Sequence, residues 1–298
     1  MALQNIPSSA FAVIVVCDGP DHETAVLLNQ CGLRQQLNLR LLQAPVKGGP
    51  AAARNIGWRV AQTPLIAFTD DDCLPQPSWL DAFTTGYAGE ELMAYSGKTI
   101  VPMPDKNTDF ALNLKQLEYG AFITANCACT YKALLKVNGF DERFKMAWRE
   151  DSDLEFKLIS QQIPIRKIGE AEVVHPVRTV PWGISVKEQK KGLYDALLYK
   201  KFPELFKAKS YAPIWNYYSI TLLTLLLFIG IYLNLTFLIA VSACGLLYLL
   251  AQFIARRLNN RHKSWPQVVE IASTSLVIPF ISVFWRLYGS IKYRVFFF

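Results

Sequence analysis

The first part of the chain alternates short apolar runs with longer stretches whose apolar residues recur at helical spacing. Residues 11–17 (FAVIVVC) form a continuous apolar run, as expected for a strand buried on both faces. The same reasoning predicts further strands at 39–43 and 65–69 and helices at 21–36 and 51–61. Strands that alternate with helices predict parallel pairing in an α/β layered domain.

In such domains ligands bind beyond the carboxyl ends of the strands. Asp18 follows the first predicted strand, and Asp70, Asp71 and Asp72 follow the strand at 65–69. These two strand ends are therefore the first places where we expect a site.

The pattern between residues 94 and 175 is less regular. It predicts a strand at 94–101, helices at 132–137 and 151–160, and two short strands at 165–168 and 173–175. Cys127 and Cys129 would share one face of a strand, because side chains alternate with a period of two. The six cysteines lack the spacing of a zinc site, so we expect reduced, buried thiols in a cytosolic domain.

The last third of the chain is apolar. No charged residue or histidine occurs from 210 to 255, which is long enough for two helical membrane passes of about 20 residues each. We predict passes at 214–233 and 235–255, with a hinge near Asn234. A third apolar segment, 268–285, contains Glu270 and Pro279 and either crosses the membrane or lies re-entrant or interfacial.

Charge follows the same division. Seven basic residues and one acidic residue follow position 209, so this tail carries +6 of the net charge of +7. The basic balance is therefore a juxtamembrane effect and does not indicate a nucleic-acid partner. The cluster of Arg256, Arg257, Arg261 and Lys263 follows the second pass. The positive-inside rule places this cluster and the N-terminal domain in the cytosol, at the cytoplasmic (inner) membrane.

A lysine-rich connector precedes the membrane segments, with apolar and aromatic residues between its lysines. This pattern is typical of helices in a membrane interface, and equally of a solvated helix packed on the domain. The predicted organisation is a catalytic-type domain at 1–180, the connector at 181–212 and a membrane domain at 213–298. Residues 1–10 have neither the basic start nor the apolar run of a signal peptide.

Three motifs carry candidate chemistry. In TDDDC, Asp70 and Asp72 point to one side of an extended chain and form a hard-oxygen site for Mg²⁺ or Mn²⁺. The alternative is a solvated acidic turn before a helix near Pro77. In REDSDL, Glu150 and Asp151 either cap a helix or supply a carboxylate that takes a proton from an acceptor hydroxyl.

The third motif, KGGPAAARNIG, opens a helix whose N–H groups could meet an anion, or it is an ordinary loop. Arg54 in this helix could contact a phosphate or brace the acidic triplet. His175, in VVHP, is either a hydrogen-bonded histidine at a strand end or a metal ligand.

Together these pieces resemble the family 2 glycosyltransferases of the GT-A fold. The resemblance runs from residue 11 to 175 through VIVVCDGPDHET, KGGPAAARNIGW, LIAFTDDDCLPQPSWL, VNGFDERF and REDSDLEFKL. It implies a GT-A mixed sheet domain, Rossmann-like, followed here by C-terminal transmembrane helices. It also implies transfer of a sugar from a nucleotide-sugar donor, with Mn or Mg as the divalent metal.

The resemblance also implies residue roles. Asp70 and Asp72 would grip the metal and the donor diphosphate, and His175 would complete the metal site. Asp151 would be the catalytic base, with Glu150 beside it. The remaining donor-binding residues would be Asp18, which reads the nucleoside base, and Asp71, Arg54 and Asn55, which line the pocket.

The chain departs from the family in two ways. It begins at what matches the family's second strand, so we expect a domain that lacks the first strand-helix unit. It also lacks the QxxRW signature of processive synthases, so we expect the addition of a single sugar. The resemblance further implies an inverting reaction. Closeness to the membrane suits a saccharide or lipid-linked acceptor in polysaccharide, glycolipid or cell-envelope synthesis. The alternatives are a nucleotidyltransferase on a similar sheet and a membrane protein with a catalytically decayed transferase domain.

Overall fold

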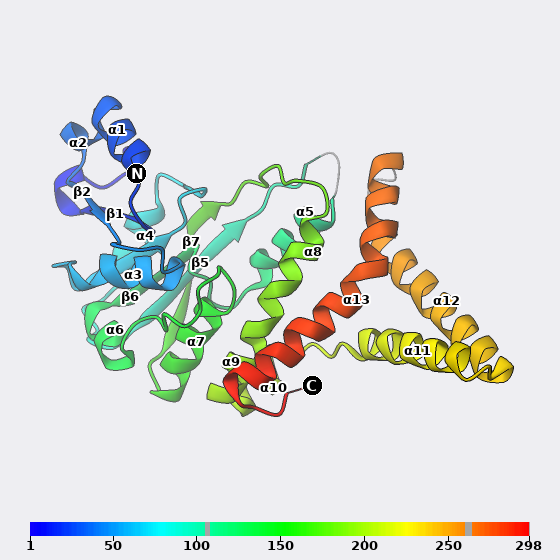
Figure 1. Ribbon diagram of the computed structural model, residues 1–298. Coiled ribbons are helices and arrows are strands. Elements are labelled where there is room, and N and C mark those ends of the chain that lie inside the picture. Colours follow the sequence, from blue (N-terminus) through cyan, green and yellow to red (C-terminus); the bar gives the residue numbers. More distant parts are fainter. Residues whose placement is uncertain (105–107, 260–263, 298) are drawn as a thin grey trace. The chain divides into compact units, whose positions relative to one another are not determined.

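The computed structural model describes residues 1–104, 108–259 and 264–297. The chain divides into two compact units. The first comprises Met1–Pro102 and Lys115–Val177, and the second comprises Met103–Leu114 and Arg178–Phe298. Figure 1 shows that the first unit combines strands and helices, whereas the second is helical.

The strands of the first unit form two sheets. In the smaller sheet, β1 (Val13–Cys17) pairs in parallel with β2 (Leu39–Gln43). The larger sheet has the strand order β3-β6-β5-β7-β4. Its strands are β3 (Leu65–Thr69), β4 (Leu74–Pro75), β5 (Ala94–Ile100), β6 (Asn126–Thr130) and β7 (Ile165–Val174).

The larger sheet is mixed, as the GT-A resemblance implies. Only β5 and β7 pair in parallel, and every other pair in this sheet is antiparallel. The expectation of parallel pairing therefore holds for β1 and β2 but is wrong for β3. The cause is β6, which lies between β3 and β5 and runs antiparallel to both.

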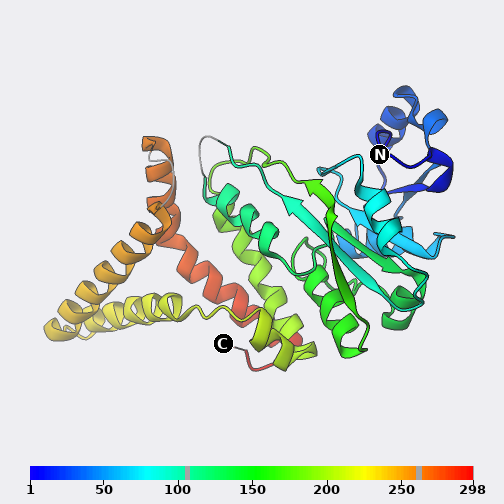
Figure 2. The ribbon, with the colours of Figure 1, turned by 180° about the vertical axis from the view of Figure 1, so that it is seen from behind.

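Helices cover both faces of the larger sheet (Figures 1 and 2). Alternate residues of β3, β5 and β6 feed two separate cores, so that Cys127 and Cys129 lie in one core and Ala128 in the other. One core includes α3 (Pro50–Arg59), α6 (Tyr131–Val137) and α7 (Glu150–Ser160), and the other includes α4 (Trp79–Gly86). Cys127 and Cys129 share one face, as the spacing predicted, and both are buried.

Two element boundaries differ from the sequence expectation. The helix expected at 21–36 is two helices, α1 (His22–Gln30) and α2 (Leu33–Gln36), because Gly32 adopts a left-handed conformation with φ of 67°. The two short strands expected at 165–168 and 173–175 are one strand, β7, and the pairing with β5 shifts register between Ser96 and Lys98.

The expectation that the run at 11–17 is buried on both faces is wrong. Cys17 is buried, but the other residues of β1 remain partly exposed. Helix α3 covers one face, where Val16 lies close to Gly57. Among the described residues, β1 pairs only with β2, so no strand covers its other edge.

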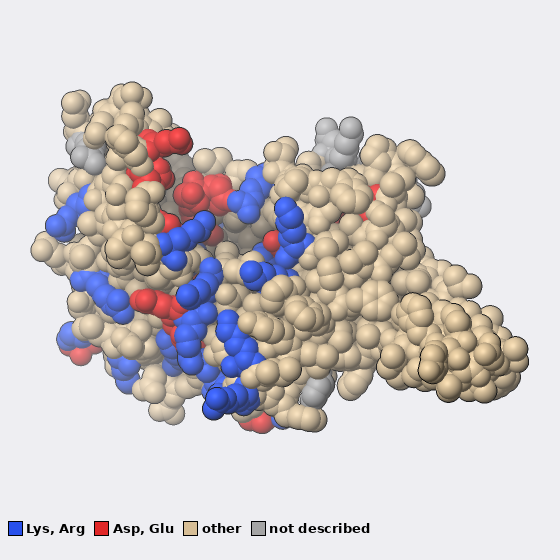
Figure 3. Space-filling view, in the orientation of Figure 1, with Lys and Arg blue, Asp and Glu red and all other residues tan. Residues whose placement is uncertain are grey.

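Among its described residues, the second unit has three long apolar helices, α11 (Trp215–Tyr232), α12 (Thr236–Leu258) and α13 (Trp265–Tyr293). All three are long and apolar enough to cross a membrane. The first two are joined by a turn at Asn234, which has a φ of 54°. In Figure 3 the surface over α11 and α12 shows no charged side chain on the face drawn.

Shorter helices complete the second unit: α8 (Ile184–Glu188), α9 (Leu193–Lys201), α10 (Pro203–Lys209) and, shared with the first unit, α5 (Asp109–Lys115). Short 3-10 turns occur in the first unit at Ser8–Ala10 and Gln116–Tyr119, and in the second unit at Gln189–Gly192. Apolar residues of α9, among them Leu193 and Ala196, are buried against α13. A Cβ on Gly289 of α13 would lie 2.6 Å from the Leu193 carbonyl oxygen, so the two helices are in close contact. These apolar residues of α9 therefore pack inside the second unit, whereas Trp182 of the connector is exposed.

Helix α13 bends part-way along its length (Figure 1) and contains Pro279. A proline inside a helix removes one backbone hydrogen bond and is a common cause of such a bend. Of the basic cluster expected after the second pass, Arg257 is buried and Arg256 is exposed. Arg261 and Lys263 lie outside the described residues.

Candidate active site

The acidic triplet turns the chain directly from β3 into β4. The backbone N–H of Cys73 donates a hydrogen bond to the carbonyl oxygen of Asp70 at 3.2 Å. Strand β4 then pairs with β7 in a register that sets Leu74 opposite Val174. Because the pairing is antiparallel, Cys73 and His175 are the next opposed positions. This register places His175 next to the acidic triplet.

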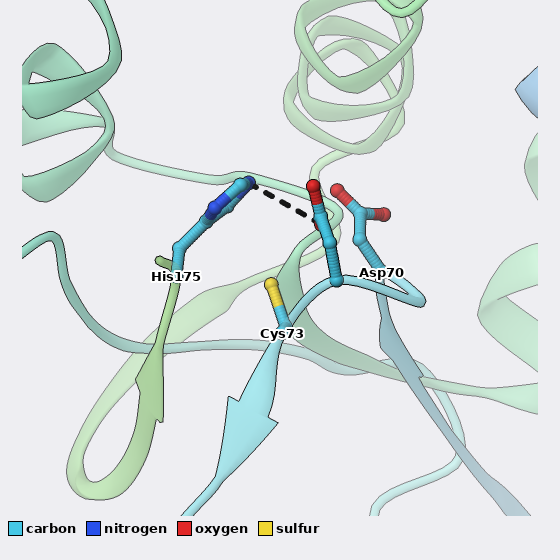
Figure 4. A group of neighbouring side chains, drawn as sticks. Asp70, Cys73 and His175 are labelled. Atoms are coloured by element: carbon cyan, nitrogen blue, oxygen red, sulfur yellow. Dashed lines mark ion pairs between the residues drawn. The ribbon is translucent and has the colours of Figure 1, made fainter. Parts of the chain in front are cut away.

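Four side chains meet at this point. Asp70, Asp72, Cys73 and His175 each offer a ligand atom, and these atoms all lie within 4.8 Å of one another. Figure 4 shows the side chains directed into one shared space, with an ion-pair contact from His175. His175 Nε2 lies 3.7 Å from Asp72 Oδ1. This cluster joins the metal ligands that the sequence proposed and adds Cys73 to them.

The donor set fits a divalent cation. An ion at about 2.1 Å from each of two ligand atoms can bridge atoms up to about 4.2 Å apart, so the separation of His175 Nε2 and Asp72 Oδ1 is suitable. His175 Nδ1 lies 3.3 Å from the carbonyl oxygen of Pro176. A proton on Nδ1 satisfies that carbonyl and leaves the Nε2 lone pair facing the carboxylates.

Cys73 is the least suited of the four ligands. Burial, together with the nearby charges of Asp70 and Asp72, raises the pKa of the Cys73 thiol to about 12. A protonated thiol is a poor ligand for a hard cation, which prefers oxygen. We therefore keep Asp70, Asp72 and His175 as the candidate ligands.

Arg54 joins the acidic loop to the start of α7. Its Nη2 donates to Asp70 Oδ1 at 2.6 Å, and its Nη1 donates to Glu150 Oε1 at 3.1 Å. The guanidinium also lies over the Phe140 ring, 5.7 Å from its centroid. Of the two roles that the sequence left open for Arg54, the structure shows the brace.

Glu150 and Asp151 begin α7 after Arg149, whose φ of 73° is uncommon for a residue with a side chain. Glu150 is only 4% exposed, and its Oε2 has no hydrogen-bond partner among the described residues. Burial, and then the neighbouring charge of Asp151, raises the pKa of Glu150 to about 7, although Arg54 opposes the shift. Glu150 therefore carries a proton over much of the range below neutral pH.

Asp151 is half-buried beside Glu150. Its Oδ1 accepts hydrogen bonds from the backbone N–H and the hydroxyl of Ser152, at 2.6 and 3.4 Å. Burial raises the pKa of Asp151 above its ordinary value, against the opposing effects of Ser152 and Arg149. Within the part of the chain that the structure describes, Oδ2 of Asp151 accepts no hydrogen bond.

Strand β6, which pairs with β3, lies beside the site. The Cys127 thiol is fully buried there, and the charges of Arg54, Asp70 and Asp151 all act on it. Burial raises the pKa of Cys127 well above its ordinary value, so the side chain stays a neutral thiol. The shared effect on Cys127 shows that Asp151 belongs to the same neighbourhood as Asp70 and Arg54.

Asp18 lies at the end of β1 and binds the glycine loop. Its Oδ1 accepts from the backbone N–H groups of Gly48 and Gly49, at 2.7 and 2.9 Å. Gly49 has a φ of 90°, and a Cβ there would lie 2.5 Å from the Lys145 carbonyl oxygen. The loop thus needs glycine for both reasons, and its N–H groups bind a carboxylate of the protein.

Asn55 is 1% exposed and makes all of its hydrogen bonds within the protein. Its Nδ2 donates to the Phe140 carbonyl and to Glu142 Oε1, and its Oδ1 accepts from Phe140 N and Trp58 Nε1. This geometry differs from the expectation that Asn55 lines the donor pocket, because no polar group of its amide is left for a ligand. Asn55 instead fixes the loop that leads to α7.

Sequence reasoning did not assign a site role to Cys73 or Cys127. Cys73 follows the three acids directly, which is a local signal, but Cys127 has none. Asp71 is exposed in the acidic loop, outside the cluster. Figure 3 shows acidic side chains gathered around a hollow in the surface of the first unit.

Residues 2–115 match the family model for glycosyl transferase family 2. This matched segment, which includes much of the first unit, is similar to family 2 glycosyltransferase domains. Strands β3, β4 and β5 and the acidic triplet fall inside the matched segment. The motif of Glu150 and Asp151, and His175, lie beyond it.

Two relatives carry glycosyltransferase names. Pre-mycofactocin glycosyltransferase of Mycobacterium tuberculosis is 30% identical over 158 residues, which cover 48% of this chain and 33% of the relative. Glycosyltransferase AglE of Haloferax volcanii is 29% identical over 105 residues, covering 35% of this chain and 34% of the relative. The chain thus spans about a third of the length of these curated relatives.

A solved structure extends the likeness of fold beyond the matched segment. The mannosyltransferase PcManGT from Pyrobaculum calidifontis, determined with GDP-Man and Mn²⁺, has a TM-score of 0.53 and 16% identity. The alignment covers 98% of this chain and 80% of that protein. At this identity the likeness shows the fold alone.

Proposed function

We propose that this protein transfers one sugar from a nucleotide-sugar donor to an acceptor hydroxyl at a membrane surface, in a metal-dependent inverting reaction. One observation carries the proposal. The Arg54 guanidinium holds Asp70 of the candidate metal site and Glu150 of the candidate base motif at 2.6 and 3.1 Å. A single side chain thereby fixes the two parts that such a reaction needs.

Asp70, Asp72 and His175 would hold the metal. When bound, the cation supplies charge that stabilises the leaving nucleoside diphosphate. The set combines carboxylate oxygens with an imidazole nitrogen, which suits Mn²⁺ better than Mg²⁺. The solved mannosyltransferase of the same fold, which holds GDP-Man and Mn²⁺, supports this choice.

Asp151 is the proposed catalytic base. Its Oδ2 takes the proton of the acceptor hydroxyl as that oxygen attacks the anomeric carbon of the sugar. The bond from that carbon to the diphosphate breaks on the opposite face, and the nucleoside diphosphate leaves with the electron pair. The raised pKa of Asp151 makes its carboxylate a stronger base than an exposed aspartate.

The remaining site residues are proposed to position the donor and the elements that carry the metal ligands and the base. Glu150 and Arg54 keep the start of α7 at a fixed distance from the acidic loop. Asp18 holds the glycine loop through Oδ1, and its Oδ2, which accepts no bond from the described residues, is proposed to contact the donor's base. Asp71, exposed beside the metal ligands, is proposed to contact the donor, and Asn55 contributes indirectly by fixing its loop.

The long apolar helices support a location of the protein in a membrane. We place the transferase domain at 1–180, a connector at 181–212 and a membrane domain at 213–298. Helices α11 and α12 cross the cytoplasmic membrane with the transferase domain in the cytosol. A saccharide or lipid-linked acceptor would suit that position, and the missing QxxRW signature favours a single addition.

The test is release of nucleoside diphosphate from a panel of nucleotide-sugars by the full chain in membranes with Mn²⁺. We expect Asp151→Asn to lower kcat by about 10²–10⁴-fold, as for loss of a general base. Asp72→Ala should lower the rate by about a hundredfold or more and weaken Mn²⁺ binding.

The matched control is Asp81→Asn, which removes an exposed carboxylate of α4 and should leave the rate unchanged. Full activity in Asp151→Asn would refute the assignment of the base. An absence of release by the wild type with every donor would instead favour a decayed transferase.

A further inference from the structure

Two arginines of the second unit are buried, and their surroundings differ. Arg257, 8% exposed, donates from Nη2 to Asp109 at 2.6 Å. Its Nη1 donates to the hydroxyls of Thr274 and Ser275 at 2.9 and 2.8 Å. The charge of Arg257 is thus paired with a carboxylate, and its N–H groups have hydroxyl partners, so a structural role explains its burial.

Arg286, in the second half of α13, is 4% exposed and has no such set of partners. Its guanidinium lies over the Phe297 ring, 4.3 Å from the centroid. Its Nε is buried without a hydrogen-bond partner, and no carboxylate among the described residues pairs with it. An aromatic face stabilises a buried cation only in part, since it accepts none of the hydrogen bonds that the guanidinium donates in its own plane.

A second polar group without a partner lies within reach of this charge. The Tyr218 hydroxyl, on α11, is buried and has no hydrogen-bond partner within the described chain. Helix α11 packs against α13, which carries Arg286, and the charge of Arg286 acts on the Tyr218 hydroxyl. Neither Arg286 Nε nor the Tyr218 hydroxyl has a hydrogen-bond partner among the described residues, and the guanidinium has no acceptor for the phenol proton. An acceptor that carries negative charge would satisfy both.

The surroundings indicate where such an acceptor comes from. Lys190 lies over the Trp285 ring at 5.5 Å, and Lys292 lies over the Tyr288 ring at 5.9 Å. Aromatic rings with cations beside them are typical of the boundary between membrane and water. Helix α13 is itself apolar enough to span a membrane. An anionic group that reaches Arg286 from this boundary, along an apolar helix, would be attached to a hydrocarbon chain.

We propose that Arg286 and Tyr218 form a binding site for the phosphate group of a phosphate-bearing lipid. The planar guanidinium presents paired N–H groups that match two phosphate oxygens, and the phenol donates to a third. The apolar side chains of α11 and α13 then accommodate the hydrocarbon. That this lipid carries the acceptor rests on the proposed function, but its binding does not.

The test is equilibrium binding of dodecyl phosphate to the full chain in dodecyl maltoside, followed by native mass spectrometry without any sugar donor. We expect one saturable site in the wild type, and an affinity lower by about tenfold or more in Arg286→Gln. Arg286→Lys keeps the charge but not the paired geometry, so it should fall between the two. Tyr218→Phe should bind a few-fold more weakly. The matched control Lys292→Gln removes an exposed charge of the same helix and should bind as the wild type does.

Inorganic phosphate distinguishes the two sources of the anion. The proposal requires that it compete poorly, because it has no hydrocarbon chain. Equal binding of inorganic and dodecyl phosphate would overturn the assignment to a lipid. Unchanged binding in both Arg286→Lys and Tyr218→Phe would overturn the site, whether or not Arg286→Gln folds. Since no donor is present, these outcomes are independent of transferase activity.

Discussion

The two sheets of the first unit are both built from apolar strands, yet they are packed to very different degrees. In the larger sheet Ala94, Tyr95 and Cys129 are fully buried between helices. In the smaller sheet only Cys17 of β1 is buried. Asp18 follows β1, whereas Asp70 follows β3 of the larger sheet.

The difference separates the two tasks of the site. The candidate metal ligands and the base motif are fixed by a dense core, which holds side chains in place. The candidate contact to the donor's base is carried by a lightly covered sheet, where local opening costs less free energy. We therefore expect changes on the larger sheet to affect the rate and the stability, and changes on the smaller sheet to affect donor affinity.

The largest effect on stability is expected for Arg54→Met. The change leaves Asp70 and buried Glu150 without their shared cation, which should lower the free energy of unfolding by about 3–5 kcal/mol. The measurement is thermal unfolding in detergent, monitored together with nucleoside diphosphate release. Arg59→Met is the matched control, because Arg59 sits in the same helix, is 49% exposed and lies 3.6 Å from Glu142. Equal unfolding temperatures for the two variants would break the comparison.

A smaller effect is expected for Asp18→Asn on the lightly covered sheet. The neutral amide weakens the two bonds from Gly48 and Gly49, and a charged hydrogen bond contributes about 1.5–3 kcal/mol. We expect KM for the donor to rise about tenfold while kcat changes little, as measured by steady-state kinetics. A fall in kcat at unchanged KM would show that the smaller sheet also positions the reacting groups.

The smallest effect is the pH dependence of stability contributed by Glu150. Its pKa in the folded protein, about 7, lies above the ordinary carboxyl value, so the folded state holds the proton more tightly. The stabilisation is fully present below the ordinary value and is lost as the pH rises to about 7. The unfolding temperature of Glu150→Gln, measured with EDTA between pH 5 and 8, should fall less with rising pH than that of the wild type. Parallel profiles would contradict the raised pKa.

Local patterns could predict the parts of the site that lie at the ends of single elements. The apolar run before Asp70 and the acids before α7 are short-range signals, and both elements form where expected. The position of His175 was not predictable in the same way, since it depends on a two-residue pairing between β4 and β7. No local pattern specifies a contact between segments a hundred residues apart.

Side-chain direction limited the predictions in a different way. Arg54 and Asn55 are neighbours in one helix, and the family resemblance implied that both line the donor pocket. The structure turns Asn55 into the loop at Phe140 and leaves Arg54 with the acids. Consecutive residues of a helix point about 100° apart, so the position of the helix on the sheet decides which one faces the site. That position depends on packing with β1 and β3 and not on the helix sequence alone.

The pairing of β4 with β7 covers only Leu74 and Pro75, at one edge of the larger sheet. Everything from β4 to β7, including β5, β6 and the base motif, lies in the loop of chain between Asp72 and His175. A ligand bound to both side chains therefore cross-links the two ends of that loop and restricts the unfolded chain as a disulfide would. The residues proposed to hold the donor's diphosphate thus also close this loop. Binding of a ligand at the site and folding of the domain are therefore thermodynamically linked.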